Sequence, residues 1–366
     1  MIDEAANRRN AALMIALLVA ALYFAVRTAL LLAGPGLDDP ALPVHVAGLV
    51  ATLGGFLALL NKSDADQRRA FLGNGVIGLP YFWLLALFLV PFLIVLKISL
   101  SDVALARPPY MPQLDLSGGW TAIVDFLSEL DFENFVFLTS DDLYWKAYLS
   151  SLQIALIATF ATLLVGYPMA YGMARAPKEW QATLLMLVIL PFWTSFLIRV
   201  YSLMGILGNE GLLNQLLLWT GLISTPLQIL NTKIAVYIGI VYTYLPFMIL
   251  PIYAALEKMD ESLLEAAEDL GCSRLEAFWL VTFPLSRGGI VAGCFLVFIP
   301  TIGEFVIPSL LGGSGTLMIG KVLWEEFFNN RDWPVASAVA VILLLILIVP
   351  IILFQRNEQK AREAEG

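Results

Sequence analysis

The sequence has few charged residues and few side chains that bind metals. Only 14% of its 366 residues are charged and 59% are hydrophobic, whereas a soluble domain has about 25% charged residues. The balance of 21 basic and 30 acidic residues leaves no polycationic surface, which argues against nucleic-acid binding. His45 is the single histidine and the two cysteines, Cys272 and Cys294, form no ligand cluster, so no metal or haem site is expected. A mean hydropathy of +0.81 indicates a protein that is solvated by a lipid bilayer.

Long apolar runs make up most of the sequence, and eight of them have the length of a membrane-spanning helix. About 20 mostly apolar residues are needed for a helix to cross the hydrocarbon core. Windows of that size fall at roughly 11–33, 43–60, 77–98, 147–172, 182–205, 232–256, 289–311 and 334–354. No window alternates apolar and polar residues as a barrel strand does. The sequence therefore predicts an all-α, polytopic helical membrane protein with about eight transmembrane helices.

The basic residues are unevenly distributed between alternate loops. If the N-terminus is cytoplasmic, thirteen lie on the inner side: Arg8, Arg9, Lys62, Arg68, Arg69, Arg175, Lys178, Lys258, Arg274, Arg287, Arg356, Lys360 and Arg362. Six then lie on the outer side: Lys97, Arg107, Lys146, Lys233, Lys321 and Arg331. Because Lys and Arg concentrate in cytoplasmic loops, we expect both termini to be cytoplasmic.

Residues 1–61 predict a transmembrane hairpin that is separate from the remaining spans. Arg8 and Arg9 precede an apolar run of about 23 residues, which exceeds the roughly 7–15 residues of a signal-peptide core. We therefore expect a retained helix here. A polar cytoplasmic linker over 62–76 follows, then a transmembrane core over 77–356 and a cytoplasmic tail over 357–366.

The longest predicted outer loop, 99–146, is acidic. It holds eight acidic residues and two basic ones: Asp102, Asp115, Asp125, Glu129, Asp131, Glu133, Asp141 and Asp142 against Arg107 and Lys146. Such a loop is either a solvated surface or one that attracts a cationic solute or a partner protein. Two further outer segments, 206–231 and 312–333, have clustered apolar residues and predict short helices at the outer membrane interface.

The inner segment 257–287 predicts two short helices joined by a glycine. Asp260 can cap the first helix, and Gly271 offers the positive φ that ends it after Leu270. Ser273 followed three residues later by Glu276 is a capping box for the second helix. Apolar residues are expected to share one face of each helix: Leu263, Ala267 and Leu270 on the first, and Leu275, Phe278 and Trp279 on the second. Because this segment has no core of its own, the apolar face is expected to bind another protein.

This segment resembles the EAA signature of ABC-importer permease subunits. It reads Glu265-Ala266-Ala267, three residues, Gly271, nine residues, Val281, one residue, and then Phe283-Pro284. The family pattern has Ile and Leu at the positions of Val281 and Phe283, so both departures exchange one apolar side chain for another.

Three further runs resemble the spermidine/putrescine branch of these permeases. They are PFWTSFLIRVY at 191–201, GEFVIPSLLGG at 303–313 and NRDWP at 330–334. With the run over 79–99, they extend the resemblance over roughly 75–355, which implies a six-helix type I importer core preceded by the hairpin. Related branches import other small solutes, so an amino-acid derivative, a quaternary amine or a metal chelate is the alternative cargo.

The resemblance implies a multi-pass transport subunit of the bacterial inner (cytoplasmic) membrane and not an enzyme. Such a subunit forms the solute path with a second homologous permease, receives solute from an extracytoplasmic binding protein and is driven by two ATPase subunits. ATP and Mg would be held by the ATPases, and this chain has no GxxxxGK[ST] phosphate loop, so no cofactor is expected in it.

The resemblance also implies which residues couple the permease to the ATPase. The EAA segment is similar to a coupling helix that fits a groove of the ATPase and moves as a rigid lever when the ATPases close. The coupling residues would be Glu265, Ala266, Ala267, Gly271, Ser273, Phe283 and Pro284.

Glu304 is the acidic residue that lies well inside a predicted span. A charge at the centre of a membrane helix costs roughly 2.5–3.5 kcal/mol, so it is a functional candidate. Pro300, Gly303 and Pro308 surround it, and we expect the helix to be kinked and some of its carbonyls to be free. A carboxylate beside free carbonyls suits an ammonium group. The alternative is a structural ion pair or hydrogen bond between helices.

The remaining candidates for the solute path are an arginine and four aromatic residues. Arg199, near the outer end of its span, either anchors the helix at the interface or pairs with an acid such as Glu304. Aromatic side chains either bind a cation in the pore or pack in the bundle and at the interface. The full set of candidates is Glu304, Phe305, Trp193, Tyr201, Tyr244 and Arg199.

Two other classes of membrane protein explain the sequence less well. A stand-alone secondary transporter or channel would need several intramembrane charges for ion coupling, and it leaves the EAA segment unexplained. An intramembrane enzyme would need paired catalytic carboxylates, a HExxH helix or a GxSxG turn, and the sequence has none of these.

Overall fold

Helices make up most of the part of the chain that the structure describes, which confirms the all-α class. This computed structural model describes residues 65–113 and 119–365, with isolated positions at 16–17, 20, 23, 44, 46–48 and 50–52. The chain divides into two compact units, Met1–Phe92 and Leu93–Gly366. The predicted hairpin 1–61 lies largely outside the described residues, so it stays a prediction.

The helices follow one another with short connections. They are α3 (Ala65–Ser99), α4 (Gly119–Ser128), α5 (Glu133–Ser140), α6 (Asp142–Ala174), α7 (Lys178–Ile189), η1 (Leu190–Trp193), α8 (Phe196–Leu207), α9 (Leu212–Trp219), α10 (Lys233–Glu257), α11 (Ser262–Asp269), α12 (Arg274–Ala277), η2 (Phe278–Thr282), α13 (Phe283–Leu285), α14 (Arg287–Ile302), α15 (Val306–Leu311), α16 (Ile319–Trp324), η3 (Glu325–Asn330) and α17 (Trp333–Glu365). A two-stranded antiparallel hairpin, β1 (Asp102–Val103) with β2 (Tyr110–Met111), follows α3.

Five helical segments of the described chain are long and apolar enough to cross a membrane. They are Pro80–Ser99, Asp142–Ala174, Phe196–Trp219, Lys233–Glu257 and Trp333–Ile352. A sixth span results if Arg274–Leu285 and Arg287–Ile302, which meet at 63°, count as one. The described residues thus account for five or six spans and do not confirm the predicted count of eight, since 11–33 and 43–60 lie mostly outside them.

Two predicted boundaries fall inside longer helices. The helix α3 begins at Ala65, so most of the predicted linker 62–76 is helical, and α17 continues to Glu365 through the predicted tail 357–366. The predicted helices of the outer segments 206–231 and 312–333 are confirmed as α9 and as α16 with η3.

The predicted span 182–205 is broken instead of continuous. The helix α7 ends at Ile189, a 3₁₀ turn carries Pro191, and Thr194 is extended before α8 begins at Phe196. Proline has no N–H for the helical ladder and its ring crowds the preceding turn, which explains why the regular helix ends here.

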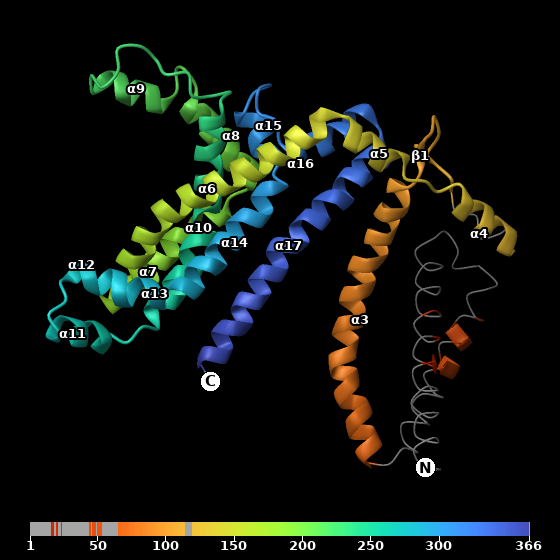
Figure 1. Ribbon diagram of the computed structural model, residues 1–366, viewed down its shortest axis with the longest axis horizontal. Helices are drawn as coiled ribbons and strands as arrows, with labels where there is room; N and C mark the ends of the chain where they lie inside the picture. Colours follow the sequence, from red (N-terminus) through yellow and green to blue (C-terminus); the bar gives the residue numbers. More distant parts are fainter. Residues whose placement is uncertain are drawn as a thin grey trace. The chain divides into compact units, whose positions relative to one another are not determined.

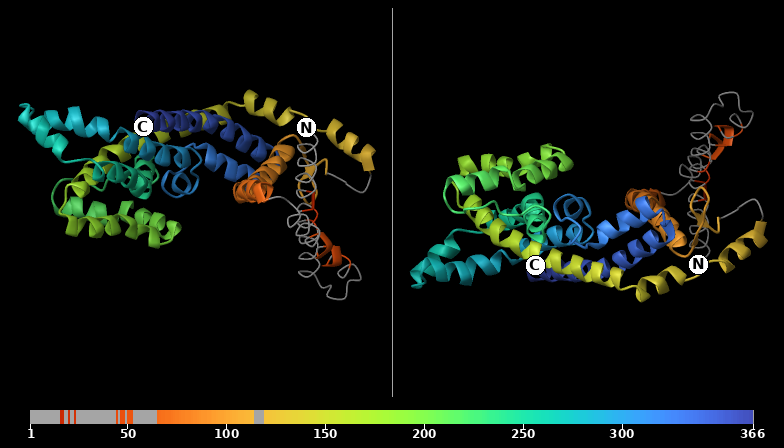
Figure 2. Two further views of the ribbon diagram at one scale, coloured as in Figure 1. Left: turned by 90° about the horizontal axis from the view of Figure 1, so that it is seen from below. Right: turned by 90° about the horizontal axis from the view of Figure 1, so that it is seen from above.

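The core of the second unit is built on α10, which packs against both α6 and α14 (Figure 1). Met248, Ile249 and Ile252 of α10 are completely buried in this core. A second buried cluster joins α6 to α16 and α17, where the Tyr148 hydroxyl donates to the Val339 carbonyl at 2.8 Å. Figure 2 shows the cyan segment that contains α11 and α12 projecting beyond the neighbouring helices. This projection presents one candidate site, and the α10–α14 packing supports the other.

Candidate functional site

The projecting segment is a helix, a glycine elbow and a second helix, as predicted. The Ser262 N–H donates to Asp260 Oδ1 at 3.0 Å at the start of α11, and Gly271 has a φ of 90°. The capping box is complete, because the Ser273 N–H donates to Glu276 Oε2 at 2.7 Å and the Glu276 N–H donates to Ser273 Oγ at 3.3 Å. The hydrogen bond from the Ser273 N–H to the Glu276 carboxylate holds the pKa of Glu276 below its ordinary value.

The exposed apolar face of this segment is wide, but it differs in two residues from the prediction. Leu270, Leu275 and Trp279 are 87%, 70% and 56% exposed. The prediction that Ala267 and Phe278 share this face is wrong. Ala267 is buried, and Phe278 turns toward α6. The reason is that each short helix also needs an inward face that attaches it to the bundle.

Side chains of α6 provide that attachment. The Phe278 ring lies edge-on to the rings of Tyr167 and Tyr171, with both centroid separations at 5.7 Å. The hydroxyls of Tyr167 and Ser286 are 3.0 Å apart, and Arg175 Nη1 lies 4.0 Å from Glu261 Oε1. Sequence reasoning missed these α6 residues, because the EAA spacing describes only the segment itself.

The predicted coupling residues fall into an exposed group and an anchored group. Glu265, Ala266, Gly271 and Ser273 are exposed, whereas Phe283 and Pro284 are half-buried at the 63° bend into α14. A movement of the exposed group can therefore pass to α6 through the rings of Tyr167 and Tyr171, and to α14 through the bend.

The second site is the break between α14 and α15. The helix ends at Ile302, residues 303–305 are not helical, and α15 begins at Val306, which agrees with the predicted kink. Glu304 is 8% exposed, and its Oε1 accepts hydrogen bonds from the N–H groups of Phe305, Val306 and Ile307 at 3.1, 2.9 and 3.3 Å. Its Oε2 accepts one from the Tyr244 hydroxyl at 2.6 Å. The carboxylate thus caps α15 and joins it to α10.

Gly320 allows α16 to approach this break. A Cβ atom at position 320 would collide with the carbonyl oxygen of Gly303 and would lie 2.7 Å from that of Glu304. A glycine is therefore required where α16 passes the break.

Arg199 is buried on α8 without an anionic partner in the described part of the chain. It is 9% exposed, its Nε has no hydrogen-bond partner, and no described carboxylate forms an ion pair with it. Its guanidinium carbon instead lies 5.0 Å from the centroid of the Phe192 ring and 5.9 Å from that of Phe196. No described ion pair joins Arg199 to Glu304, and its predicted role as an interface anchor stays a prediction.

Aromatic rings connect Arg199 to Glu304. Phe192 meets Phe247 edge-on at 5.1 Å, and Phe247 lies 6.1 Å from Tyr244, whose hydroxyl bonds to Glu304. The structure thus brings Glu304, Tyr244 and Arg199 into one network. Sequence reasoning missed Phe192 and Phe247, because η1 and α10, which contribute them, lie more than fifty residues apart in the chain.

The other predicted pathway residues lie outside this network. Phe305 stacks on Trp324 at a centroid separation of 4.7 Å. Trp193 in η1 and Tyr201 in α8 are 74% and 56% exposed. A pore surface that included them would need contributions from another chain.

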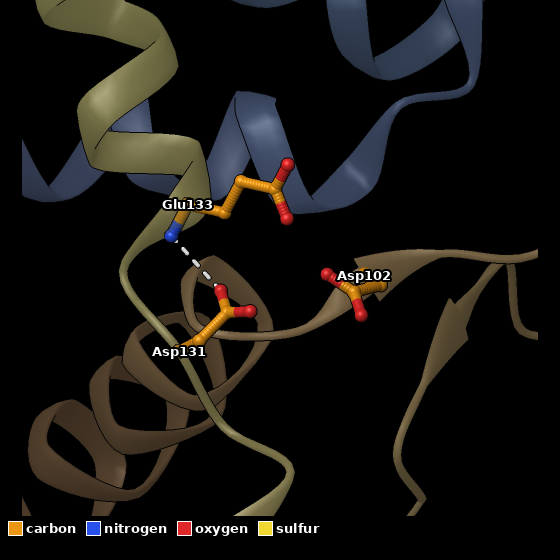
Figure 3. Close-up of side chains that lie close together, drawn as sticks. All are labelled: Asp102, Asp131 and Glu133. Carbon is orange, nitrogen blue, oxygen red and sulfur yellow. Dashed lines mark hydrogen bonds between the residues drawn. The ribbon is translucent and has the colours of Figure 1, made fainter.

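One group of carboxylates in the outer segment has the geometry to share a cation. Asp102 on β1, Asp131 and Glu133 at the start of α5 point toward one another in Figure 3, with ligand oxygens within 4.8 Å. All three are exposed, and Asp131 Oδ1 is already bonded to the Glu133 N–H at 2.9 Å. Exposed carboxylates gather in this way without an ion, so we assign no metal to them.

The chain matches known transport proteins over most of its length. Residues 50–362 match the family described as "Binding-protein-dependent transport system inner membrane component", a range that contains the predicted core 77–356. The spermidine/putrescine transport system permease protein PotB of Escherichia coli is 42% identical over 257 residues, which are 65% of this chain and 94% of that protein. The protein of the same name from Haemophilus influenzae is 46% identical over 224 residues, which are 61% of this chain and 78% of that protein.

A solved structure supports the fold. One chain of a bacterial alginate ABC transporter in complex with an alginate-bound periplasmic protein superposes with a TM-score of 0.57, covering 81% of this chain and 96% of that chain at 17% identity. At this identity the similarity between the two structures supports the fold alone. The family match and the permease relatives together show that this chain belongs to the binding-protein-dependent inner-membrane permeases of ABC transporters, and so is a multi-pass transport subunit that works with ATPase and binding-protein partners.

Proposed function

We propose that this chain is one of two permeases in an ATP-driven importer of spermidine and putrescine. The observation that supports this cargo most strongly is the similarity to spermidine/putrescine permeases over nearly the whole length of those relatives. The chemistry of the bundle agrees with it, because the carboxylate of Glu304 is buried among the helices and no described cation pairs with it.

Glu304 is the counter-charge for the ammonium groups of the solute in this proposal. Amines of this kind titrate near pH 10, so a polyamine is a polycation at neutral pH. A cation that leaves water needs fixed negative charge, carbonyl dipoles or aromatic faces in place of its hydration. Glu304 and Tyr244 supply a carboxylate and an aromatic ring at one place, and both retain a small exposed surface of 8% and 9%. The exposed rings of Trp193 and Tyr201 would face the path from η1 and α8.

The projecting α11–α13 segment is the coupling element in this proposal. Two ATPase subunits bind and hydrolyse ATP with Mg, and one of them receives the exposed face of this segment, with Glu265 as an ionic contact. The segment then lies in the cytoplasm with both chain termini. An extracytoplasmic binding protein delivers the solute to the opposite side, and a second homologous permease completes the path.

Solute-stimulated ATP hydrolysis tests the cargo. The complete complex in nanodiscs is supplied with the binding protein and one solute at a time: spermidine, putrescine, a neutral amino-acid derivative, a quaternary amine or a metal chelate. Spermidine and putrescine should stimulate hydrolysis several-fold over the solute-free rate, and the other solutes should not. Stimulation by one of the others, with none by polyamines, would replace the cargo and leave the permease role intact.

A further inference from the structure

A groove of about 600 Å³ lies in the second unit between the short hairpin and the start of α17. The connection between β1 and β2 lines one side, and the junction of η3 with α17 lines the other. The apolar part of the lining consists of Ala106, Pro108, Pro109, Phe327, Phe328 and Trp333. Arg107 and Arg331 complete it, one from each side, so the groove combines apolar walls with two positive charges.

The groove lies at a membrane interface, because two spans end beside it. The hairpin follows the span that ends at Ser99, and Arg331 stands two positions before the span that begins at Trp333. Lys97 Nζ lies 4.1 Å from the centroid of the Tyr110 ring, which attaches the hairpin to the end of α3, and Tyr110 lies 6.2 Å from Trp333. Tyrosine and tryptophan concentrate at the level of the lipid headgroups, so their position here is typical of that interface.

Exposed apolar side chains continue from the groove onto the hairpin. Val103 is 60% exposed, Leu105 is fully exposed, and Phe328 at the groove is 53% exposed. A lipid bilayer removes such side chains from water, whereas a small aqueous anion would leave them in contact with it. This continuity favours an occupant that brings apolar chains with it.

Stacked rings and a strained turn fix the shape of the groove. Phe327 and Trp333 are parallel within 6° at a centroid separation of 4.8 Å. Arg331 has a φ of 57°, in the left-handed region that favours glycine, and the turn is held by the Asp332 N–H, which donates to the Glu326 carbonyl at 2.9 Å. Strain of this kind persists where the surrounding structure enforces it, often at functional sites. A site of fixed shape binds its ligand without first becoming ordered.

The charges of the groove favour a phosphate group. Both arginines are exposed, and neither forms an ion pair in the described part of the chain. The neighbouring carboxylates already accept hydrogen bonds: Asp332 Oδ1 from the Val335 N–H at 3.0 Å, and Glu326 from two side chains. The planar guanidinium group, with its several N–H donors, matches the oxygens of a phosphate.

The exposed acidic residues of this region lie at the other end of the hairpin. Asp102 pairs with Met111 where the two strands begin and end, and its carboxylate lies within 4.8 Å of those of Asp131 and Glu133 (Figure 3). Arg107 lies in the connection between the strands, at the closed end. The hairpin thus separates this negative charge from the positive charges of the groove.

We propose that this groove binds the headgroup of an anionic phospholipid from the surrounding bilayer. Arg107 and Arg331 pair with its phosphate, and an acyl chain begins along Phe328 and Pro108. Basic residues beside the ends of membrane spans recognise anionic lipids in this way. The inference is independent of the cargo, since it needs only that the chain spans a membrane.

A lipid in this groove also supports the rings beside the broken helix. Phe328 lies 4.0 Å from Trp324, and Trp324 stacks on Phe305 at 4.7 Å. Phe305 directly follows Glu304, so the rings extend from the groove to the break between α14 and α15. The bound lipid should therefore raise the unfolding temperature of the complex.

The lipids retained by the complete complex test this site. The complex is purified in a non-ionic detergent, mixed with an excess of phosphatidylglycerol and phosphatidylcholine that have identical acyl chains, and weighed by native mass spectrometry. Each wild-type chain should hold one phosphatidylglycerol that Arg107→Gln/Arg331→Gln lacks, and phosphatidylglycerol should raise the unfolding temperature of the wild type more than that of the variant. Arg107→Lys/Arg331→Lys keeps the charges and should retain the lipid. The matched control, Lys146→Gln, removes the exposed cation that pairs with Asp142 and should match the wild type.

Four results would overturn the inference. The first is an equal lipid count for the wild type and the glutamine variant, with the complex recovered intact. The second is retention of phosphatidylcholine in place of phosphatidylglycerol, which would contradict selection by charge. The third is displacement of the lipid by glycerol phosphate, which would assign the groove to a free phosphate. The fourth is an unchanged lipid count together with weaker capture of a soluble protein, which would assign the groove to a protein contact.

Discussion

At the scale of single residues, the bundle keeps two opposite charges buried and apart. The Glu304 carboxylate is satisfied by three backbone N–H groups and a tyrosine hydroxyl, so it stabilises the broken helix even without solute. The Arg199 guanidinium lies over two phenyl rings and lacks a described anion. Glu304 therefore combines a structural role with its proposed role in transport, and the two can be separated by substitution.

Glu304→Ala should unfold more readily than Glu304→Gln. Alanine leaves the N-terminus of α15 and the Tyr244 hydroxyl without an acceptor, which costs about 2 kcal/mol or more, while glutamine keeps an oxygen in place. Thermal unfolding of the purified permease, followed by intrinsic fluorescence, measures the difference. Glu210→Ala, at an exposed position, serves as the control and should match the wild type. Equal unfolding temperatures for the alanine and glutamine variants would contradict the capping role.

Arg199→Met should leave the isolated permease as stable as the wild type, or make it more stable. The substitution loses ring contacts worth about 0.5–2 kcal/mol but removes a buried charge that no described group compensates. Thermal unfolding of the isolated chain provides the measurement. A fall of several degrees would mean that Arg199 has an anionic partner within this chain.

At the scale of elements, locally encoded features could be predicted from the sequence and contacts between elements could not. The ends of α11 and α12 follow from Asp260, Gly271 and the Ser273–Glu276 spacing, because a cap needs only residues a few positions apart. The inward turn of Phe278 depends on rings of α6 more than a hundred residues earlier in the chain. In the same way, the kink at Glu304 was predictable from its prolines and glycine, whereas its bond to Tyr244 was not.

The glycine elbow should be sensitive to the smallest possible side chain. Gly271→Ala meets no atom within 4 Å, but a φ of 90° is strained for alanine by about 1–2 kcal/mol, so α11 should shift relative to α12. We expect less ATPase to co-purify with this variant, or solute to stimulate hydrolysis less. Gly288→Ala is the matched control, since its added methyl is equally free of contacts and its φ is not positive. Identical recovery and coupling in the two variants would contradict a rigid elbow.

The close approach of α16 to the break between α14 and α15 should also be disrupted by an added methyl group. In Gly320→Ala the new methyl group collides with the carbonyls of residues 303 and 304, so α16 must move away from the site of Glu304. We expect lower thermal stability and lower transport. In Gly315→Ala the methyl meets nothing within 4 Å, which makes it the control. Wild-type behaviour of Gly320→Ala would show that α16 and the break are not held together as described.

At the scale of the whole molecule, one packed core of the second unit joins the segment proposed to contact the ATPase to the proposed cation site at Glu304. The α11–α13 segment is attached to α6 and α14, and both of these helices pack on α10, which also carries Tyr244. A displacement of the segment can therefore reach the Tyr244–Glu304 bond without passing through a loop. This continuity is what a permease driven by a distant ATPase requires.

Uptake of radiolabelled spermidine into proteoliposomes that contain the complete complex tests this account most directly. With ATP and the binding protein present, uptake should be competed by putrescine, should fall at least tenfold in Glu304→Gln with normal recovery of the ATPase, and should stop without ATP. Glu210→Gln, at an exposed position, should transport as the wild type does. Undiminished, ATP-dependent uptake by a fully assembled Glu304→Gln complex would contradict the account.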